Sequence, residues 1–314
     1  MYRAFFKLRH NPFNVNPDPR FLYCTRATVK ALASLAHGIY RRKGFILLTG
    51  EVGTGKTTIV NKLLEWLRTQ NASTAFIFHP SLEPVQFLDM ILADFGVRCD
   101  SPLKSQKILH LHKFLLERHR AGGTAVLIVD EAQDLSPEVL EEIRLLTNLE
   151  TSTHKLLQIL LSGQPELDET LRRPEMRQVR QRVTIRCKTY PLTLEEVQAY
   201  ISTRLRVAGA PAEPIFAPDA VRAVHRHSKG IPRVINFLCE HALIAAFADQ
   251  QRTIRGNTID LIAHENELDD PRVGYPQPVP DQADESLTAL REAESTGAEQ
   301  SHARAAGGMT TDPR

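Results

Sequence analysis

The sequence predicts an α/β protein with a parallel five-stranded sheet, followed by a small all-helical domain and a disordered tail. Three observations predict this fold. The sequence GEVGTGKT at residues 50–57 follows a short apolar run, a second apolar run at 125–129 ends in two carboxylates, and only helical patterns follow Pro191. Strands and helices that alternate with short links are typical of a parallel sheet covered by helices.

The bulk composition is that of an ordinary globular protein. The chain has 314 residues, of which 42% are hydrophobic and 24% charged, and it has room for two domains. It contains no run near the roughly 20 apolar residues that a membrane-spanning helix needs, and its N-terminus lacks the apolar region of a signal peptide. We therefore expect a cytoplasmic protein. The cysteines are scattered without a CxxC pair, which predicts no zinc site.

The elements up to residue 190 alternate between helices and strands. Val29, Leu32, Leu35 and Ile39 keep helical spacing, so a helix is expected before the glycine-rich loop. Strands are expected at 45–48, 74–79, 125–129, 157–162 and 183–187. Further helices are expected at about 56–70, 84–95, 105–119 and 137–149. The last of these begins with a serine N-cap, a proline and a glutamate, a strong start signal.

The segment after Pro191 changes to helices alone. A capping box at Thr193–Glu196 starts a helix to about residue 207, and further helices fit 218–227, 232–248 and 256–265. Residues 269–314 carry nine acidic and four basic residues, a net charge of −5, with five prolines and one aromatic. Such a segment buries too little apolar surface to fold, so we expect a disordered tail with a short helix near 284–295. The remaining residues carry a net charge of +7.

Four regions follow from these patterns. They are an N-terminal segment at 1–43, an α/β domain at 44–190 that contains the glycine-rich loop, a small helical domain at 191–268 and the acidic, proline-rich tail at 269–314.

Residues 50–57 fit the phosphate-binding pattern G-x-x-x-x-G-K-[ST]. Its glycines let the backbone turn tightly, while successive N–H groups and the following helix N-terminus attract phosphate. Lys56 is expected to reach the terminal phosphates and Thr57 to offer its hydroxyl to Mg²⁺. The predicted nucleotide-binding residues of this loop are Gly50, Glu51, Val52, Gly53, Thr54, Gly55, Lys56, Thr57 and Thr58.

Two carboxylates, Asp130 and Glu131, follow the apolar strand at 125–129. A parallel strand delivers them to the same edge of the sheet as the phosphate loop. Asp130 is expected to hold Mg²⁺ together with Thr57, and Glu131 to activate the attacking water, which suits phosphoryl transfer. The alternative is a solvated acidic pair after a core strand. Because the chain lacks the N/T-K-x-D element of GTPases, we predict ATP as the nucleotide.

A basic group lies between residues 172 and 188. It consists of Arg172, Arg173, Arg177, Arg180, Arg182, Arg186 and Lys188. Three interpretations stay open: a solvated helix face, an arginine that reaches the γ-phosphate held by a neighbouring subunit, and a contact to nucleic acid. Arg233 lies at the start of a predicted helix, where the helix dipole disfavours a cation, so an anion contact is favoured there.

Several of these segments together resemble one family. The start of the chain (MYRAFFKLRHNPFNVNPDPRFLY) is joined by GFILLTGEVGTGKTT, LIVDEAQDL, LLSGQPEL, RQRV and GIPRVIN. This combination, over about residues 1–268, resembles the general secretion pathway protein A (ExeA-type) ATPases. These belong to the AAA+ class and have relatives among transposition-helper ATPases of the TniB and MuB type.

The resemblance implies an AAA+ module with a helical lid and a homo-oligomer that forms on nucleotide binding. It places Gln164 at the sensor-1 position, with Ser162 as a neighbour able to serve. It identifies Arg182 as the arginine finger, with Arg180 in reserve, and Arg233 as sensor 2. Members of the secretion pathway typically continue into a transmembrane helix and a periplasmic region, whereas a polar tail follows here.

The expected function is Mg²⁺-dependent ATP hydrolysis that drives assembly or remodelling of a partner complex, associated with secretion or export by resemblance. The alternative is an ATP-dependent DNA-binding helper of transposition or replication. A third class is an interaction scaffold that binds nucleotide and scarcely hydrolyses it.

Overall fold

The computed structural model describes residues 1–14, 18–78 and 82–268. The predicted tail and its short helix at 284–295 lie outside the described residues. No helix in the described part of the chain is both long enough and apolar enough to cross a membrane.

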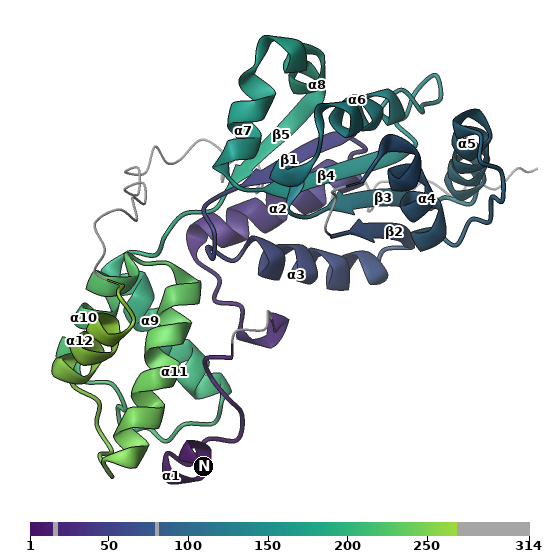
Figure 1. Ribbon diagram of the computed structural model, residues 1–314. Helices are drawn as coiled ribbons and strands as arrows, with labels where there is room; N and C mark the ends of the chain where they lie inside the picture. The colour runs from purple at the N-terminus through teal and green to yellow at the C-terminus, as the bar shows by residue number, and fades with distance from the viewer. Residues whose placement is uncertain (15–17, 79–81, 269–314) are drawn as a thin grey trace, which may run out of the picture. The chain divides into compact units, whose positions relative to one another are not determined.

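Five parallel strands form the central sheet, in the order β2-β3-β4-β1-β5 (Figure 1). The strands are β1 Phe45–Thr49, β2 Ala72–Ile77, β3 Thr124–Val129, β4 Leu157–Gly163 and β5 Val183–Lys188. In the register, Thr49 lies beside both Gly163 and Lys188. The carboxyl ends of β1, β4 and β5 therefore meet at one edge, where the glycine-rich loop leaves β1.

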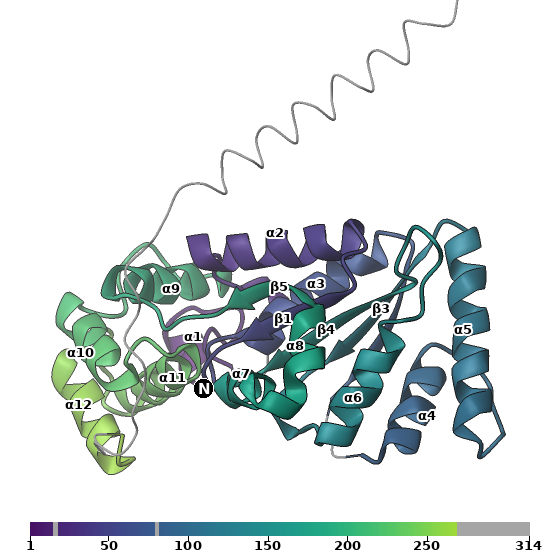
Figure 2. The same cartoon turned by 90° about the horizontal axis from the view of Figure 1, so that it is seen from above.

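Helices cover both faces of the sheet (Figures 1 and 2). On one face lie α2 Arg26–Tyr40 and α3 Lys56–Arg68. On the other lie α4 Pro84–Asp94, α5 Lys104–Arg120, α6 Pro137–Leu146, α7 Pro165–Arg172 and α8 Arg177–Arg182. Along β1, Phe45 and Leu47 face the second group while Ile46 and Leu48 face the first. A strand buried on both sides explains the continuous apolar run in the sequence.

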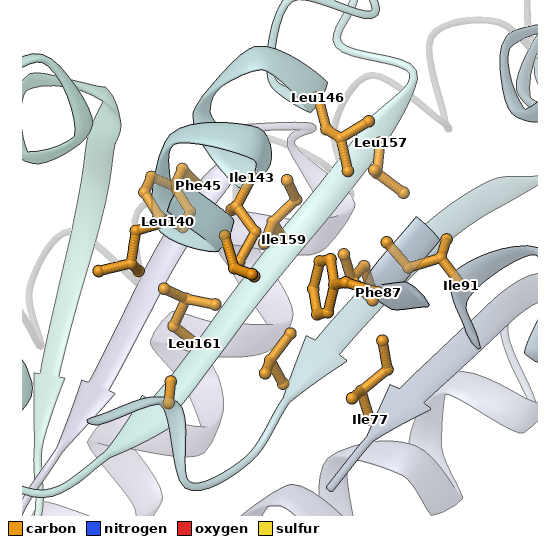
Figure 3. Close-up of a cluster of buried hydrophobic side chains, with 14 of the residues drawn as sticks. Phe45, Ile77, Phe87, Ile91, Leu140, Ile143, Leu146, Leu157, Ile159 and Leu161 are labelled. Atoms are coloured by element: carbon orange, nitrogen blue, oxygen red, sulfur yellow. The ribbon is translucent and has the colours of Figure 1, made fainter. Parts of the chain in front are cut away.

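The larger core lies between the sheet and α4–α8. Figure 3 shows Phe87 and Ile91 of α4, together with Ile143 of α6, packed over Ile159 and neighbouring strand residues, all of them buried. This packing fixes β3 and β4 relative to β1, and so fixes where their carboxyl ends meet the loop at residues 50–55.

Four helices form the lid: α9 Leu194–Val207, α10 Pro218–Ser228, α11 Pro232–Ala248 and α12 Gly256–Glu265. The N-terminal segment, with α1 Tyr2–Phe5 and a 3₁₀ turn at Pro19–Phe21, contributes Phe6, Phe13 and Phe21 to the same core. Polar contacts tie it there: the Tyr2 hydroxyl donates to Glu240 at 2.9 Å and Arg204 donates to the Pro12 carbonyl at 2.6 Å. The segment is thus part of the lid's core before the chain enters the sheet.

Some element boundaries differ from those expected. The helix predicted to reach residue 149 ends at Leu146, because the Thr147 hydroxyl donates to the Arg144 carbonyl and Leu149 pairs with Leu156. Strand β2 begins and ends two residues earlier than predicted. Val29, one of the apolar positions whose spacing predicted helix α2, is 53% exposed.

Helices α7 and α8 and a 3₁₀ turn at Ala132–Asp134 were not predicted. With eight and six residues, the two helices are too short to be stable alone. They form because Leu167, Leu171 and Val179 pack into the larger core.

Candidate nucleotide-binding site

The glycine-rich loop needs its glycines for close packing as well as for its turns. Gly53 has φ +78°, and a Cβ there would lie 2.7 Å from Cβ of Arg233. A Cβ on Gly50 would lie 1.9 Å from Oγ1 of Thr189, beyond the end of β5. Any side chain at either position would push the loop away from the lid or from β5. The two glycines therefore let the loop sit between the sheet edge and the start of α11.

Lys56 is the first residue of α3 and is only 6% exposed. Its ammonium donates to the carbonyls of Gly50 at 2.7 Å and Glu51 at 3.0 Å, so it lies folded back along the loop. Burial lowers the pKa of this amine, while the nearby carboxylates of Glu131 and Asp130 act in the opposite direction. A cation held this way adds charge to the donors that a loop of this kind offers to phosphate.

Asp130, at the end of β3, is 4% exposed and satisfied at both oxygens. The Thr57 hydroxyl donates to Oδ2 at 2.9 Å, and the Ser162 hydroxyl donates to Oδ1 at 2.7 Å. The Glu131 backbone N–H also donates to Oδ1, at 3.1 Å. Three elements (α3, β3 and β4) thus converge on one carboxylate.

The chemistry of this donor set fits Mg²⁺. The ion prefers hard oxygen ligands and is usually bound in nucleotide sites by one or two carboxylates plus substrate phosphates. The Asp130 carboxylate and the Thr57 hydroxyl are such oxygens, and they lie at the N-terminus of α3, beside the loop.

Glu131 is held by two amides. Its backbone is left-handed, with φ +51°. Gln133 Nε2 donates to Glu131 Oε2 at 2.8 Å, and Gln164 Nε2 lies 3.4 Å from the same oxygen. The other end of the Gln133 amide accepts from the Gln164 backbone N–H at 3.0 Å. Gln133 therefore bridges the Glu131 carboxylate and the tip of β4.

Sequence reasoning did not single out Gln133. The sequence shows only a polar residue two positions after Glu131. Its contact with Glu131 depends on the 3₁₀ turn, which brings the Gln133 amide back to the Glu131 carboxylate. Both candidates for the sensor-1 position reach the acidic pair: Ser162 contacts Asp130 and Gln164 contacts Glu131.

The lid meets the loop through the start of α11. The Arg233 backbone N–H donates to the Gly53 carbonyl at 3.2 Å. The Arg233 side chain is exposed and begins beside the loop. The structure therefore brings Arg233 next to the predicted phosphate-binding residues, although the two are 180 positions apart in the sequence.

A pocket adjoins the loop and the start of α3. Gly55 and Thr58 line it on the α3 side, and segments of the N-terminus, of the β5–α9 connection and of the lid close it. Its other lining residues include Tyr23, Thr25, Tyr190, Glu196, Tyr200 and Pro232. Mostly apolar walls with a few polar groups are typical of small-molecule sites. Of the residues that line this pocket, Thr54, Gly55 and Thr58 were predicted to bind nucleotide, and Lys188 belongs to the basic group between residues 172 and 188.

Arg180 and Arg182 are not part of this site. Both are exposed on α8, and Arg182 donates to Asn148 at 3.1 Å. Arg182 precedes Val183, which pairs with Phe45 at the amino end of β1, whereas the loop follows Thr49 at the other end. The length of a five-residue strand, about 17 Å, separates the two places. A contact from either arginine to phosphate would therefore have to come from another copy of the chain.

The sequence of the chain is similar to those of known proteins. Residues 39–171 match the family model of an AAA domain. The chain is 46% identical, over 266 residues, to general secretion pathway protein A of Aeromonas hydrophila, a match that covers 84% of this chain and 48% of the relative. The chain thus spans about half the length of that curated relative.

Solved structures resemble the chain at lower identity. Drosophila ORC bound to DNA has a TM-score of 0.65 at 20% identity, covering 85% of this chain and 66% of that one. Aeropyrum pernix ORC2 has a TM-score of 0.61 at 15% identity, covering 82% and 71%. The RuvB Holliday junction branch migration motor of Thermotoga maritima has a TM-score of 0.52 at 16% identity, covering 77% and 70%. At these identities the similarity shows a shared fold.

Proposed function

We propose that this chain, an AAA+ protein related to general secretion pathway protein A, binds ATP with Mg²⁺ and hydrolyses it to ADP and phosphate. One observation carries the proposal. The Thr57 hydroxyl lies 2.9 Å from Asp130 Oδ2, although the two residues are 73 positions apart in the sequence. A carboxylate and a hydroxyl brought together at the end of a phosphate loop are the oxygens that Mg²⁺ needs beside a triphosphate.

Each residue then has a separate role. The N–H groups of residues 50–58 and the Lys56 ammonium bind the phosphates, and Thr57 with Asp130 would hold Mg²⁺, which neutralises phosphate charge when bound. Glu131 orients and deprotonates the attacking water, because its Oε1 accepts no hydrogen bond among the described residues, whereas both oxygens of Asp130 do. Ser162 and Gln164 hold the two acids, Arg233 contacts phosphate from the lid, and the pocket lined by Tyr23 and Tyr190 takes the base.

The test separates binding from turnover. Lys56→Ala should lose nucleotide binding, because it removes the buried cation of the loop. Glu131→Gln should bind ATP like the parent and lose turnover by about 100-fold or more, because it removes the base and spares the oxygens for Mg²⁺. Fluorescent ATP titration and steady-state phosphate release measure the two effects.

Asp134→Asn is the matched control, since it makes the same carboxylate-to-amide change on an exposed residue of the same turn. It should keep both binding and turnover. Equal loss of ATP affinity in the Lys56 and Glu131 variants would contradict the separate roles. A parent chain that binds ATP without releasing phosphate would favour the scaffold function.

We further propose that hydrolysis drives assembly or remodelling of a complex in the cytoplasm. A partner from a secretion or export system is favoured by the kinship with general secretion pathway protein A. The Glu131→Gln variant should form a larger species on addition of ATP, measured by light scattering, because its nucleotide stays bound. Lys56→Ala should stay at its starting size. No change in size for either variant would count against nucleotide-driven assembly.

A further inference from the structure

A second charged region lies at the opposite edge of the sheet from the nucleotide site. Three chain segments meet there: the turn from α2 into β1 (41–44), the end of α5 before β3 (117–123) and the approach to β4 (150–155). Strands β3, β4 and β1 are neighbours, so their amino ends lie in a row. We call the basic side chains of these segments the amino-edge cluster: Arg41, Arg42, Lys43, Arg118, His119, Arg120, His154 and Lys155.

Direct contacts hold the three segments side by side. Arg42 donates to the Gly123 carbonyl at 2.9 Å and lies 3.0 Å from Nδ1 of His119. The rings of His119 and His154 are 5.6 Å apart. Lys155 lies against the turn before β1, where a Cβ on Gly44 would be 3.3 Å from its Cγ. The cluster is therefore one continuous surface formed by residues far apart in the sequence.

The cluster is left with uncompensated positive charge. Among the described residues, no carboxylate lies within ion-pair distance of Arg42 or Arg118, whose partners are carbonyl, amide, hydroxyl and imidazole groups. Lys155 pairs with Glu150. The three segments carry six lysines and arginines and two glutamates, a net charge of +4. That is more than half of the +7 carried by residues 1–268, concentrated in 17 residues.

Some basic side chains of the cluster also lie close together. Burial lowers the pKa of Arg42, and burial together with Arg42 and His154 lowers the pKa of His119. A helix dipole favours cations in the last turn, which accounts for single basic residues at the ends of α2 and α5. It does not account for basic side chains brought together from three different segments. A bound polyanion would compensate their charge.

We propose that the amino-edge cluster binds the phosphate backbone of duplex nucleic acid. Four of its six permanent cations are arginines, whose planar forks match phosphate oxygens. A duplex carries one negative charge per about 1.7 Å of its axis. The two strand spacings between β3 and β1 span about 10 Å, a length of axis along which a duplex carries about six phosphate charges on its two strands. Tyr40, beside Arg41, is 73% exposed and available to pack on a sugar or base.

Other anions match less well. The chain's own residues 269–314 carry a net −5 spread over 46 residues, a far lower charge density than a duplex has. A bilayer surface supplies dense phosphate, but a polybasic patch gives stable membrane attachment only together with a second anchor. Both are kept as outcomes of the test.

The test uses the full chain without nucleotide, which makes it independent of ATP hydrolysis. Binding of a fluorescent 20-base-pair duplex is measured by anisotropy between 50 and 200 mM NaCl. The edge variant combines Arg41→Glu, Lys43→Glu and Arg120→Glu, three exposed residues whose side chains make no hydrogen bond or ion pair among the described residues. This variant should bind the duplex at least about tenfold more weakly than the parent. The slope of log affinity against log salt concentration should be smaller by about 3 units, one for each phosphate that no longer has a cation beside it.

A control variant carries Lys30→Glu, Arg206→Glu and Arg222→Glu, exposed residues outside the cluster. It makes the same change in net charge and should keep the parent affinity. Equal weakening in both variants would overturn the proposal, because it would reflect overall charge alone. No duplex binding by the parent at 50 mM NaCl would also overturn it. So would binding only to vesicles of phosphatidylserine and phosphatidylcholine, or duplex binding that appears only when the acidic residues of 269–314 are replaced by amides.

Discussion

At the scale of single residues, Gln133 holds the carboxylate of Glu131, the proposed general base, in one orientation. Its amide joins the Glu131 carboxylate to the Gln164 backbone, and a Cβ on Gly163 would lie 3.0 Å from its Oε1, so the bridge needs a glycine at that place. Gln133 is a positioning residue that acts through Glu131.

We predict that Gln133→Ala lowers kcat by about 10 to 100-fold, the effect typical of partners that orient a functional group. The KM for ATP and its affinity should stay within about twofold, because the loop and Asp130 are untouched. Steady-state kinetics measure kcat and KM, and ATP titration measures the affinity. Gln106→Ala, an exposed amide on α5, serves as the control and should leave both unchanged. A parallel rise in KM and fall in kcat would indicate that Gln133 supports the whole site instead.

Sequence patterns indicate candidate site residues when these residues lie within one contiguous motif. Lys56 and Thr57 follow from loop spacing, and Asp130 and Glu131 from the end of an apolar strand. The contact of Gln133 with Glu131 depends on a short turn, and the lining of the pocket beside the loop comes from four separate segments of the chain. Such contacts follow from tertiary packing, which local spacing does not encode.

At the scale of elements, the N-terminal segment and the lid form one hydrophobic core. Phe13 is completely buried there and packs edge-to-face on Phe216, with ring centroids 6.0 Å apart. We predict that Phe13→Ala destabilises the fold by about 3 to 5 kcal/mol, the usual cost of deleting a buried aromatic ring. Urea denaturation followed by circular dichroism measures the loss.

Leu261→Ala is the comparison variant for this prediction. It lies on α12 of the same lid and is 62% exposed, so it should change stability by less than about 0.5 kcal/mol. Similar losses in the two variants would mean that the N-terminal segment adds nothing specific to the lid core.

The strongly patterned elements were the most predictable. Helices α11 and α12 match the expected bounds, and β3 differs by one residue, because each combines a clear start signal or apolar run with burial. Short α7 and α8 escaped prediction because they are stabilised by packing and not by local propensity. The placement of residues 1–13 against the lid is a contact over more than 200 positions that no local pattern reveals.

At the scale of the whole molecule, the phosphate loop and Arg182 lie at opposite ends of the sheet. The phosphate loop lies at the carboxyl edge, whereas Arg182 precedes the amino end of β5. A single chain therefore cannot bring Arg182 to its own nucleotide without breaking the register of β5 against β1. If Arg182 is an arginine finger, each active site consists of the loop of one copy and the arginine of the next.

Mixing two inactive variants tests this division. Arg182→Ala keeps an intact nucleotide site and lacks the arginine, whereas Glu131→Gln keeps the arginine and lacks the base. Each alone should lose turnover, Arg182→Ala by on the order of 10³-fold, the effect of removing such an arginine.

In a random mixture, about a quarter of adjacent pairs would join an intact site to an intact arginine, so phosphate release should recover to roughly that fraction of the parent rate if neighbouring sites act independently. Arg172→Ala mixed with Glu131→Gln is the control, because Arg172 is an exposed arginine at the end of α7 and its variant should be active alone. Recovery is impossible if the arginine acts within its own chain, since no copy in the mixture then has both groups. Absence of recovery, in mixtures shown by light scattering to co-assemble, would therefore assign Arg182 to a structural role on α8.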